Sequence, residues 1–246
     1  MRLRRIVGTG ACALLVSLAV AQQSEKLHFY VDGYADAGWA KLTGSWTSQI
    51  IRLGLRQGPF DVFVYARNED YDTEGTALPY QYIDRGLSVG VGARFWLGPD
   101  IYALVSNGQW IAGANQGDQD FRAGFAGYKD WQENDSLVDV YGDLFYIGFA
   151  EDTYLDLRVR DGRILNIDAN KNRTWIYTIL QGYASASGAN ATDNRIEAGI
   201  GAGYVFGKGH LTLNAELREG YSFRGTGITG PDRTYFNPIV YIAGNL

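Results

Sequence analysis

Hydrophobic and polar residues alternate along most of the chain, and the stretch Ile83–Leu97 shows this pattern most clearly. Most of its odd positions are apolar, as at Val89 and Val91, whereas most of its even positions are small or polar, as at Gly90 and Arg94. A period of two predicts a β-strand with one apolar and one polar face. Because glycine weakens a strand that faces bulk water, we interpret the glycine-rich face as an inner wall. The pattern is typical of a transmembrane β-barrel whose apolar face meets lipid.

The same alternation recurs often enough to predict an all-β fold, a transmembrane antiparallel up-and-down barrel of about twelve strands. Turn residues such as Gly58-Pro59 and Gly98-Pro99-Asp100 separate the alternating segments. The predicted strands are Leu27–Trp39, Trp46–Arg56, Phe60–Arg67, Ile83–Leu97, Ile101–Val105, Asp120–Tyr128, Leu137–Phe149, Thr153–Arg160, Thr174–Tyr183, Arg195–Phe206, His210–Arg218 and Thr234–Ala243.

The lengths of the connections test this topology. Outer-membrane barrels have an even number of strands, short periplasmic turns and longer outer loops. The predicted turns after the second, fourth and tenth strands are short, and those after the third, fifth, ninth and eleventh are long, as expected if both termini are periplasmic. Two connections depart from the rule: the turn after the seventh strand is short, and the segment Asp161–Arg173 after the eighth is long for a periplasmic turn. A strand count of 10 or 14 therefore stays open at this point.

Composition agrees with one barrel domain, residues 22–246. The chain has 32 glycines, 5 prolines and 14% aromatic residues, which suits long strands, tight corners and aromatic belts. Its charged residues are scattered and its net charge is −5, so no basic patch indicates nucleic acid. The alternative is a periplasmic or secreted all-β sandwich or lipocalin-like barrel, in which twelve apolar faces would have to bury one another.

The first 21 residues predict a cleaved signal peptide. Arg2, Arg4 and Arg5 precede an apolar run, and Ala19-Val20-Ala21 forms an A-x-A cleavage site. Cleavage would remove Cys12, the only cysteine, so the mature chain would contain no disulfide or thiol nucleophile. Its remaining sequence holds no apolar run long enough for a transmembrane helix. We therefore expect export through the inner membrane and insertion into the bacterial outer membrane as a closed barrel.

Three segments carry a closer resemblance. VDVYGDLFYIG, TYLDLRVRDGR and NRIEAGIGAGYVFG look similar to the C-terminal barrels of exopolysaccharide-secretion proteins and of the NfrA phage-adsorption receptor family. The resemblance implies an outer-membrane barrel connected with polysaccharide export, and a periplasmic secretion partner. Two features depart from it: those relatives carry long helical-repeat arms before the barrel, and outer-membrane proteins usually end in Phe or Trp, whereas this sequence ends in Ile242-Ala243-Gly244-Asn245-Leu246.

The sequence contains few candidate catalytic residues. The segment Leu104-Val105-Ser106-Asn107-Gly108 resembles the His-x-Ser-Asn-Gly signature of barrel lipid hydrolases, but Leu104 occupies the place of the histidine. A serine without a general base is a weak nucleophile, so we interpret Ser106 as a strand-to-loop turn residue and predict no enzyme. The mature chain has two histidines, His28 and His210, and no cysteine, so we predict no metal site and no cofactor.

The predicted lumen carries many charges of both signs, which must be hydrated or paired. Either the lumen is a narrow polar conduit for small polar or saccharide solutes, with tyrosines such as Tyr30 and Tyr34 contributing to selectivity, or it is plugged and the barrel anchors outer loops that bind partners. Lumen glycines such as Gly90, Gly92 and Gly201 favour the conduit, because they leave room. The predicted lumen and constriction residues are Asp139, Asp143, Asp156, Arg158, Arg160, Tyr141, Arg94, Arg122, Arg195 and Glu197.

A register follows for the seventh and eighth strands. If a two-residue turn near Ala150 and Glu151 joins them, Asp143 lies opposite Arg158, and both face the lumen. We expect this ion pair to be the centre of the densest charge cluster.

Overall fold

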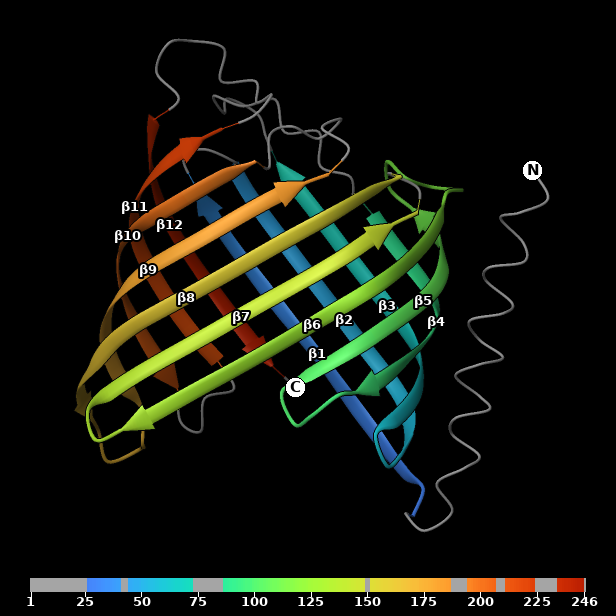
Figure 1. Cartoon of the computed structure of the whole chain (residues 1–246), viewed down its shortest axis with the longest axis horizontal. Helices are drawn as coiled ribbons and strands as arrows, with labels where there is room; N and C mark the ends of the chain where they lie inside the picture. Colours follow the sequence, from blue (N-terminus) through green and yellow to red (C-terminus); the bar gives the residue numbers. More distant parts are fainter. Residues whose placement is uncertain are drawn as a thin grey trace.

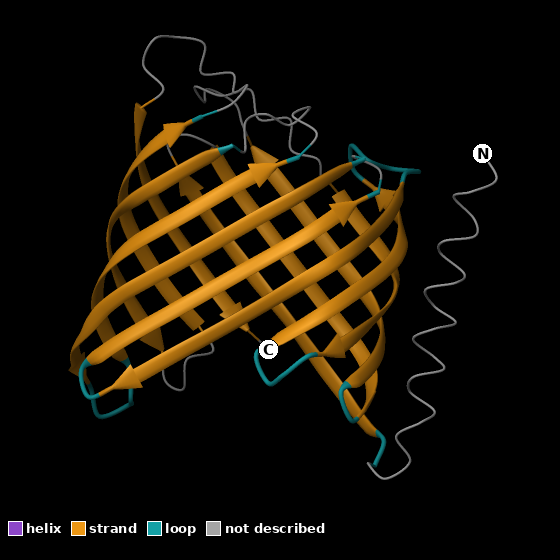
Figure 2. Cartoon of the chain, in the orientation of Figure 1, coloured by secondary structure: helices purple, strands orange, loops and turns teal. Residues whose placement is uncertain are grey.

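The computed structural model describes residues 26–40, 44–72, 86–148, 151–186, 194–206, 211–223 and 234–245, so the predicted signal peptide lies outside the described residues. Twelve antiparallel strands form one closed barrel, which confirms the predicted fold class and strand count (Figures 1 and 2). The strands are β1 (His28–Ala40), β2 (Gly44–Gln57), β3 (Phe60–Asp72), β4 (Gly86–Trp96), β5 (Ile101–Ala112), β6 (Gln119–Glu133), β7 (Ser136–Ile147), β8 (Asp152–Ile167), β9 (Arg173–Ser185), β10 (Arg195–Phe206), β11 (Leu211–Ser222) and β12 (Thr234–Asn245).

Each strand pairs with its sequence neighbours, and β1 closes the ring by pairing with β12. The closing register joins Tyr34 with Asn245 and Ala40 with Ile239. These pairs close the sheet into a ring, which is the condition for a sheet surrounded by lipid. Among the residues described, no helix is long and apolar enough to span a membrane.

The connections after even-numbered strands are all short, with two to five residues at 58–59, 97–100, 134–135, 168–172 and 207–210. The connections 73–85, 186–194 and 223–233, which follow odd-numbered strands, have 9 to 13 residues. We call these two ends of the barrel the short-turn end and the long-loop end. β1 begins and β12 ends at the short-turn end (Figure 1).

Several strands are longer than the sequence predicts. β5 continues to Ala112 and β8 to Ile167, so most of the predicted loops Ser106–Gln119 and Asp161–Arg173 are strand. The reason is that their polar and small residues continue the alternation, with Ser106 and Gly108 on the inner face and Leu165 on the outer face. The long periplasmic turn after β8 therefore disappears. Ser106 lies within a strand, so its prediction as a turn residue was wrong.

The β7–β8 register also differs from the prediction. Asp143 lies opposite Asp156, and Arg158 lies opposite Tyr141. Ile147 and Asp152 form the last pair before the connection. The connection therefore has four residues instead of the two predicted residues. Adding two residues to a turn moves the register by two, and this preserves the side-chain faces while it changes every partner.

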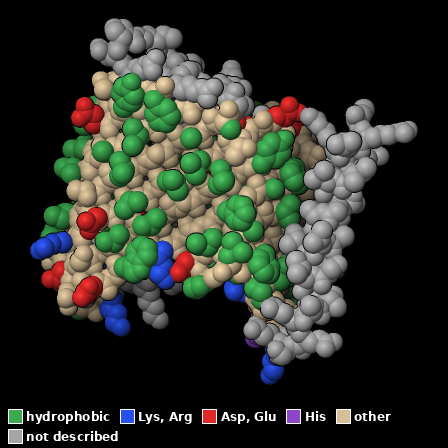
Figure 3. Space-filling view, viewed as in Figure 1, with side chains coloured by type: hydrophobic (Ala, Val, Ile, Leu, Met, Phe, Trp, Pro, Cys, Tyr) green, Lys and Arg blue, Asp and Glu red, His purple; other side chains and the backbone are tan. Residues whose placement is uncertain are grey.

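The outer wall is apolar on every strand. Examples are Val31, Leu53, Val64, Val91, Ile101, Phe125, Leu144, Leu157, Leu180, Ile200, Leu213 and Val240, all more than 40% exposed. Figure 3 shows hydrophobic side chains spread over one face of this wall, with most charged side chains toward its lower end. The fully buried side chains, by contrast, include Glu197, Asp61 and Asp120. The barrel thus has a polar interior and an apolar exterior, the reverse of a soluble sandwich.

Candidate functional site

The lumen contains two polar networks on opposite flanks. The first joins side chains from β1 to β6. Its part nearer the short-turn end surrounds Asp61, which is 1% exposed. Asp61 accepts hydrogen bonds from Arg94 at 2.9 Å, Trp96 at 2.9 Å and Tyr30 at 3.1 Å. Arg94 also contacts Asp32 on β1 at 2.6 Å. Because β1 and β4 are three strands apart, this ion pair connects two strands that are not neighbours and passes across the lumen.

A second centre of the first network lies nearer the long-loop end, around Asp120. This carboxylate accepts hydrogen bonds from Arg122 at 2.7 Å, Ser88 at 2.8 Å and Tyr65 at 2.9 Å, and Arg67 lies 3.4 Å away. A buried carboxylate surrounded by four donors remains ionised and fixes their side chains. The β1–β6 flank is therefore closed by ion pairs rather than open to solutes.

The second network joins side chains from β7 to β12. Arg160 pairs with Asp139 at 2.6 Å and donates a hydrogen bond to the Tyr241 hydroxyl at 3.1 Å. Tyr241 and Tyr177 both donate to Glu216, at 3.2 and 2.7 Å. These bonds connect β8, β9, β11 and β12 across the inside of the barrel.

Arg218 continues this network toward the long-loop end. It pairs with Glu216 and Glu197 and donates to Gln181 at 2.7 Å. Glu197 also accepts a hydrogen bond from Tyr235 at 3.0 Å, and Arg195 lies 3.4 Å from it. This flank, like the first, consists mainly of buried polar groups that bind one another.

The lumen glycines do not leave open room, which corrects the argument made from sequence. A Cβ added at Gly92 would lie 2.5 Å from the Phe63 ring, and one added at Gly201 would lie 2.5 Å from the Tyr177 ring. The same holds for Gly90, Gly203 and Gly220, which lie against Tyr65, Trp175 and Tyr235. Aromatic rings from the adjacent strand therefore fill the space above these glycines, because only a residue without Cβ admits a ring so close to the backbone.

Between the two flanks lies a set of lumen side chains that stays accessible, which we call the central strip: Tyr34 and Asp36 on β1, Tyr141 and Asp143 on β7, and Asp156 and Arg158 on β8. Tyr34 is 39% exposed, and the Arg158 side chain is 21% exposed. The other four are partly exposed.

The central strip brings opposite walls of the barrel together. β1 and β7 are six strands apart in a ring of twelve, yet Asp36 interacts electrostatically with Arg158, and Tyr34 with Tyr141. The Arg158 guanidinium lies 5.6 Å from the centre of the Tyr141 ring, and the Tyr141 hydroxyl donates to Asp143 at 2.6 Å. The accessible part of the lumen is therefore narrow and lined by tyrosines, carboxylates and one guanidinium.

The ten residues predicted for the lumen fall into three places. Tyr141, Asp143, Asp156 and Arg158 lie in the central strip. Asp139, Arg160, Arg195 and Glu197 belong to the β7–β12 network, and Arg94 and Arg122 belong to the β1–β6 network. Arg158 and Asp139 are 3.9 Å apart, which connects the central strip to the second network.

Sequence reasoning missed several members of the networks. Asp120 begins a predicted strand but is not among the predicted lumen residues, and the sequence of β9 is apolar on both faces. Its inner face carries Trp175 and Tyr177, together with Gln181. Aromatic residues with a polar group at alternate positions were the available signal, because they can fill a lumen and still donate hydrogen bonds.

No protein-family model matches the sequence, and no curated protein matches it. Among solved structures, the chain is similar to the KdgM porin in complex with disordered oligogalacturonate, at 10% identity over 87% of this chain and 98% of that chain, with a TM-score of 0.40. It is similar to a bacterial polysaccharide outer membrane secretin, at 10% identity over 88% of this chain and 97% of that chain, with a TM-score of 0.41. It is also similar to the outer membrane channel DcaP of Acinetobacter baumannii, at 11% identity over 92% and 99%, with a TM-score of 0.36.

Proposed function

We propose that this chain is a bacterial outer-membrane barrel that conducts small cations through the central strip. The membrane location is supported by the apolar outer wall, which is continuous over all twelve strands. The long-loop end would face outward and the short-turn end the periplasm, as the lengths of the connections favour. The signal peptide predicted at residues 1–21 would provide export through the inner membrane.

One observation supports the conduit: the central strip is accessible, whereas the carboxylates at the centres of both flanks are buried. Tyr34 is 39% exposed on a lumen-facing position, whereas Asp61, Glu197 and Asp139 in the flanks are at most 2% exposed. The buried networks fix the walls, and the central strip is what remains for a hydrated solute. Such a path suits small ions better than large solutes, because side chains from opposite walls interact across it.

The charge of the central strip favours cations. It contains three carboxylates, Asp36, Asp143 and Asp156, and one guanidinium, Arg158. Rings of acidic side chains select cations in other channels, because their negative charge attracts cations and repels anions. The constriction would therefore pass a small cation more readily than a chloride ion.

A small saccharide is the second candidate solute. Tyr34 and Tyr141 both belong to the central strip, and aromatic side chains provide flat apolar surfaces with polar edges. A connection with polysaccharide export would also require a periplasmic partner at the short-turn end. Oligosaccharides added to one side of a bilayer should interrupt the ionic current if sugars enter the path.

The alternative function is a non-conducting barrel that anchors its outer loops as a receptor. The packing of the flanks favours it, since aromatic rings cover the lumen glycines and ion pairs span the lumen. In that case the central strip would hold water but would not connect the two ends.

Recordings in planar bilayers separate the two functions. The purified barrel should give small, uniform conductance steps, and Tyr34→Ala should at least double them by widening the path. The matched control is Tyr102→Ala, a lumen tyrosine that packs against Trp96 at 4.9 Å in the closed flank, and it should leave the steps unchanged. A folded barrel that gives no steps, with or without Tyr34→Ala, would support the anchor instead.

A further inference from the structure

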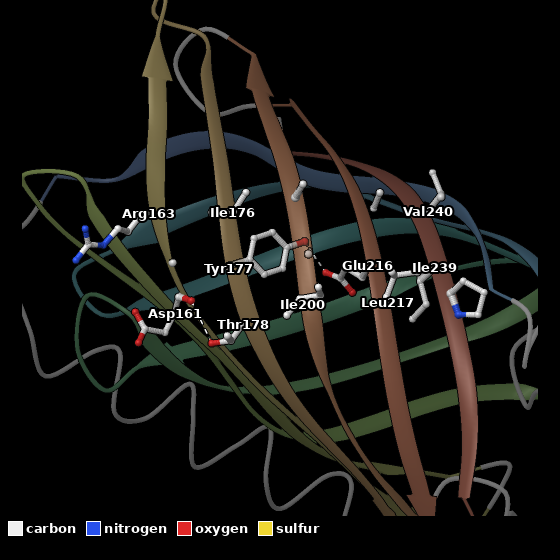
Figure 4. A pocket seen from close by; sticks show the side chains of 15 residues that line it. Asp161, Arg163, Ile176, Tyr177, Thr178, Ile200, Glu216, Leu217, Ile239 and Val240 are labelled. Atoms are coloured by element: carbon white, nitrogen blue, oxygen red, sulfur yellow. Dashed lines mark hydrogen bonds between the residues drawn. The ribbon is translucent and has the colours of Figure 1, made fainter.

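The outer wall carries a groove of about 780 Å³ across β8 to β12 (Figure 4). It lies between two cross-strand rows of outward side chains. In the first row Asp161 pairs with Thr178 and continues through Ile200 to Pro238, and in the second Arg163 pairs with Ile176 and continues through Ala202 to Val240. The groove thus follows the hydrogen-bonding direction of the sheet.

The depth of the groove comes from small residues in one wall. Ala202 on β10 and Ala215 on β11 are direct partners, so the second row is low at its middle. The side chains that rise around them are apolar and about half exposed, namely Ile176, Ile200, Leu217 and Val240. An apolar channel on a lipid-facing wall is the shape that a hydrocarbon chain fills.

The groove is long and lies beside the short-turn end. It crosses four strand spacings of about 4.8 Å each, or roughly 19 Å in total. Its second row, from Arg163 on β8 to Val240 on β12, stays three to five residues from the short-turn end of every strand. The groove therefore lies on the part of the wall that the periplasmic leaflet would cover, and it is long enough for an acyl chain to lie along it.

Among the outward side chains that line the groove, the charged ones lie at its β8 end. Arg163 and Asp161 are both exposed there and project from the same outer face of β8, two residues apart (Figure 4). A guanidinium binds a phosphate with two parallel hydrogen bonds, and a carboxylate beside it can accept an ammonium group. This arrangement of one cation and one anion complements a zwitterionic headgroup.

We propose that this groove is a binding site for one zwitterionic glycerophospholipid of the periplasmic leaflet. The phosphate contacts Arg163, the ammonium group of an ethanolamine headgroup contacts Asp161, and one acyl chain lies over Ala202 and Ala215. The site rests on the membrane insertion and orientation of the proposed function, but not on conduction. It would hold its lipid longer than the lipids that cover the rest of the wall.

Native mass spectrometry of the barrel released from a mild detergent tests the site. The natural chain should retain one phospholipid, and Arg163→Gln should lower that occupancy at least threefold. Ala215→Leu should do the same by filling the groove without changing any charge. The matched control is Lys129→Gln, an outward cation on β6 that is already paired with Asp100 at 2.6 Å, and it should keep the full occupancy. The shift in gel mobility between unheated and heated samples confirms that each variant is folded.

Further measurements identify the occupant. After removal of lipid, phosphatidylethanolamine should bind better than phosphatidylglycerol, and Asp161→Asn should abolish this preference. The proposal is overturned if the natural chain retains no lipid, or if Arg163→Gln and Ala215→Leu retain as much as the natural chain. It is also overturned if the natural chain is a dimer that Ala215→Leu converts to a monomer, because a second copy then covers the groove. Conductance is measured separately, so that the conduit and the lipid site can each fail alone.

Discussion

Asp143 of β7 and Asp156 of β8 are direct cross-strand partners, and both carboxylates face the lumen. Like charges in this position repel each other, so each carboxylate needs a hydrogen-bond donor of its own. Tyr141 donates a hydrogen bond to Asp143 at 2.6 Å, and Gln181 donates one to Asp156 at 2.9 Å. The pair thus places two carboxyl groups side by side in the accessible part of the lumen.

The first prediction follows from this repulsion. Asp143→Asn should leave the barrel as stable as the natural chain or raise its free energy of unfolding by up to about 1 kcal/mol, because one of two opposed charges is removed. The matched control is Asp139→Asn on the same strand. Asp139 is 2% exposed and pairs with Arg160, so its loss should cost about 3–5 kcal/mol by leaving a buried guanidinium uncompensated. Urea unfolding of the refolded barrel measures both, and equal effects would contradict the pairing.

The second prediction concerns the glycines under aromatic rings. Gly201→Ala should lower the free energy of unfolding by about 1–3 kcal/mol, as overpacking does. The Tyr177 ring would lie 2.5 Å from the new methyl group, and its hydroxyl is held by Glu216. Gly201→Ser, which the lumen pattern alone suggests to be mild, should be at least as damaging. Gly182→Ala is the control, because nothing lies within 4 Å of its added Cβ; a loss of stability there would show that the strand, not the ring, resists substitution.

The faces of the strands could be predicted from sequence because the period of two is a local property. The inner position of Asp32, Arg94 and Glu197 follows from their parity alone. The partners could not be predicted, since they depend on closure. Arg94 reaches Asp32 across three strands, and Tyr65 reaches Asp120 in the same way. These contacts across the lumen depend on how far each strand is offset from the next, and no short sequence pattern predicts that offset.

The β7–β8 register illustrates the same limit. The connection 148–151 contains no Asn-Gly or Asp-Gly pair that would specify a two-residue turn. Glu151 adopts a positive φ of 51°, a conformation that is uncommon for a residue with a side chain. The length of the turn, and with it the partner of every lumen charge on β7, therefore depended on tertiary structure.

The third prediction tests the lipid face. Val91→Arg or Leu213→Arg should cost roughly 2–4 kcal/mol in lipid vesicles if these positions lie near the midplane. Both side chains are exposed on the outer wall. Leu165→Arg, close to the 168–172 turn, should cost only about 0–1 kcal/mol. Refolding into vesicles of defined lipid gives the free energies, and a uniform cost at all three positions would contradict the assigned membrane boundary.

The fourth prediction is a pH effect in the β8–β9 turn, which lies outside the strands. The Asn172 side-chain amide donates to Asp168 at 2.8 Å, and the backbone N–H groups of Asn172 and Asn170 add two further bonds. These hydrogen bonds hold the pKa of the Asp168 carboxyl below its usual value. A depressed pKa contributes to stability above the unfolded pKa of about 3.9 and loses that contribution as the pH falls through the lower folded value. Titration of the Asp168 carboxyl carbon by NMR should show the low pKa, and Asn172→Ala should raise it.

The last prediction concerns the selectivity of the central strip. Arg158 is its only guanidinium and is partly exposed, whereas Arg160 is 8% exposed and tied to Asp139 and Tyr241. Arg158→Ala should therefore shift the reversal potential in a salt gradient toward cations without unfolding the barrel. Asp36→Asn should shift it toward anions, because it removes negative charge from the opposite wall. Arg163→Gln changes a guanidinium on the outer wall of the same strand, so it should leave the reversal potential unchanged. If Arg158→Ala and Arg163→Gln shift the potential equally, the current does not pass through the central strip.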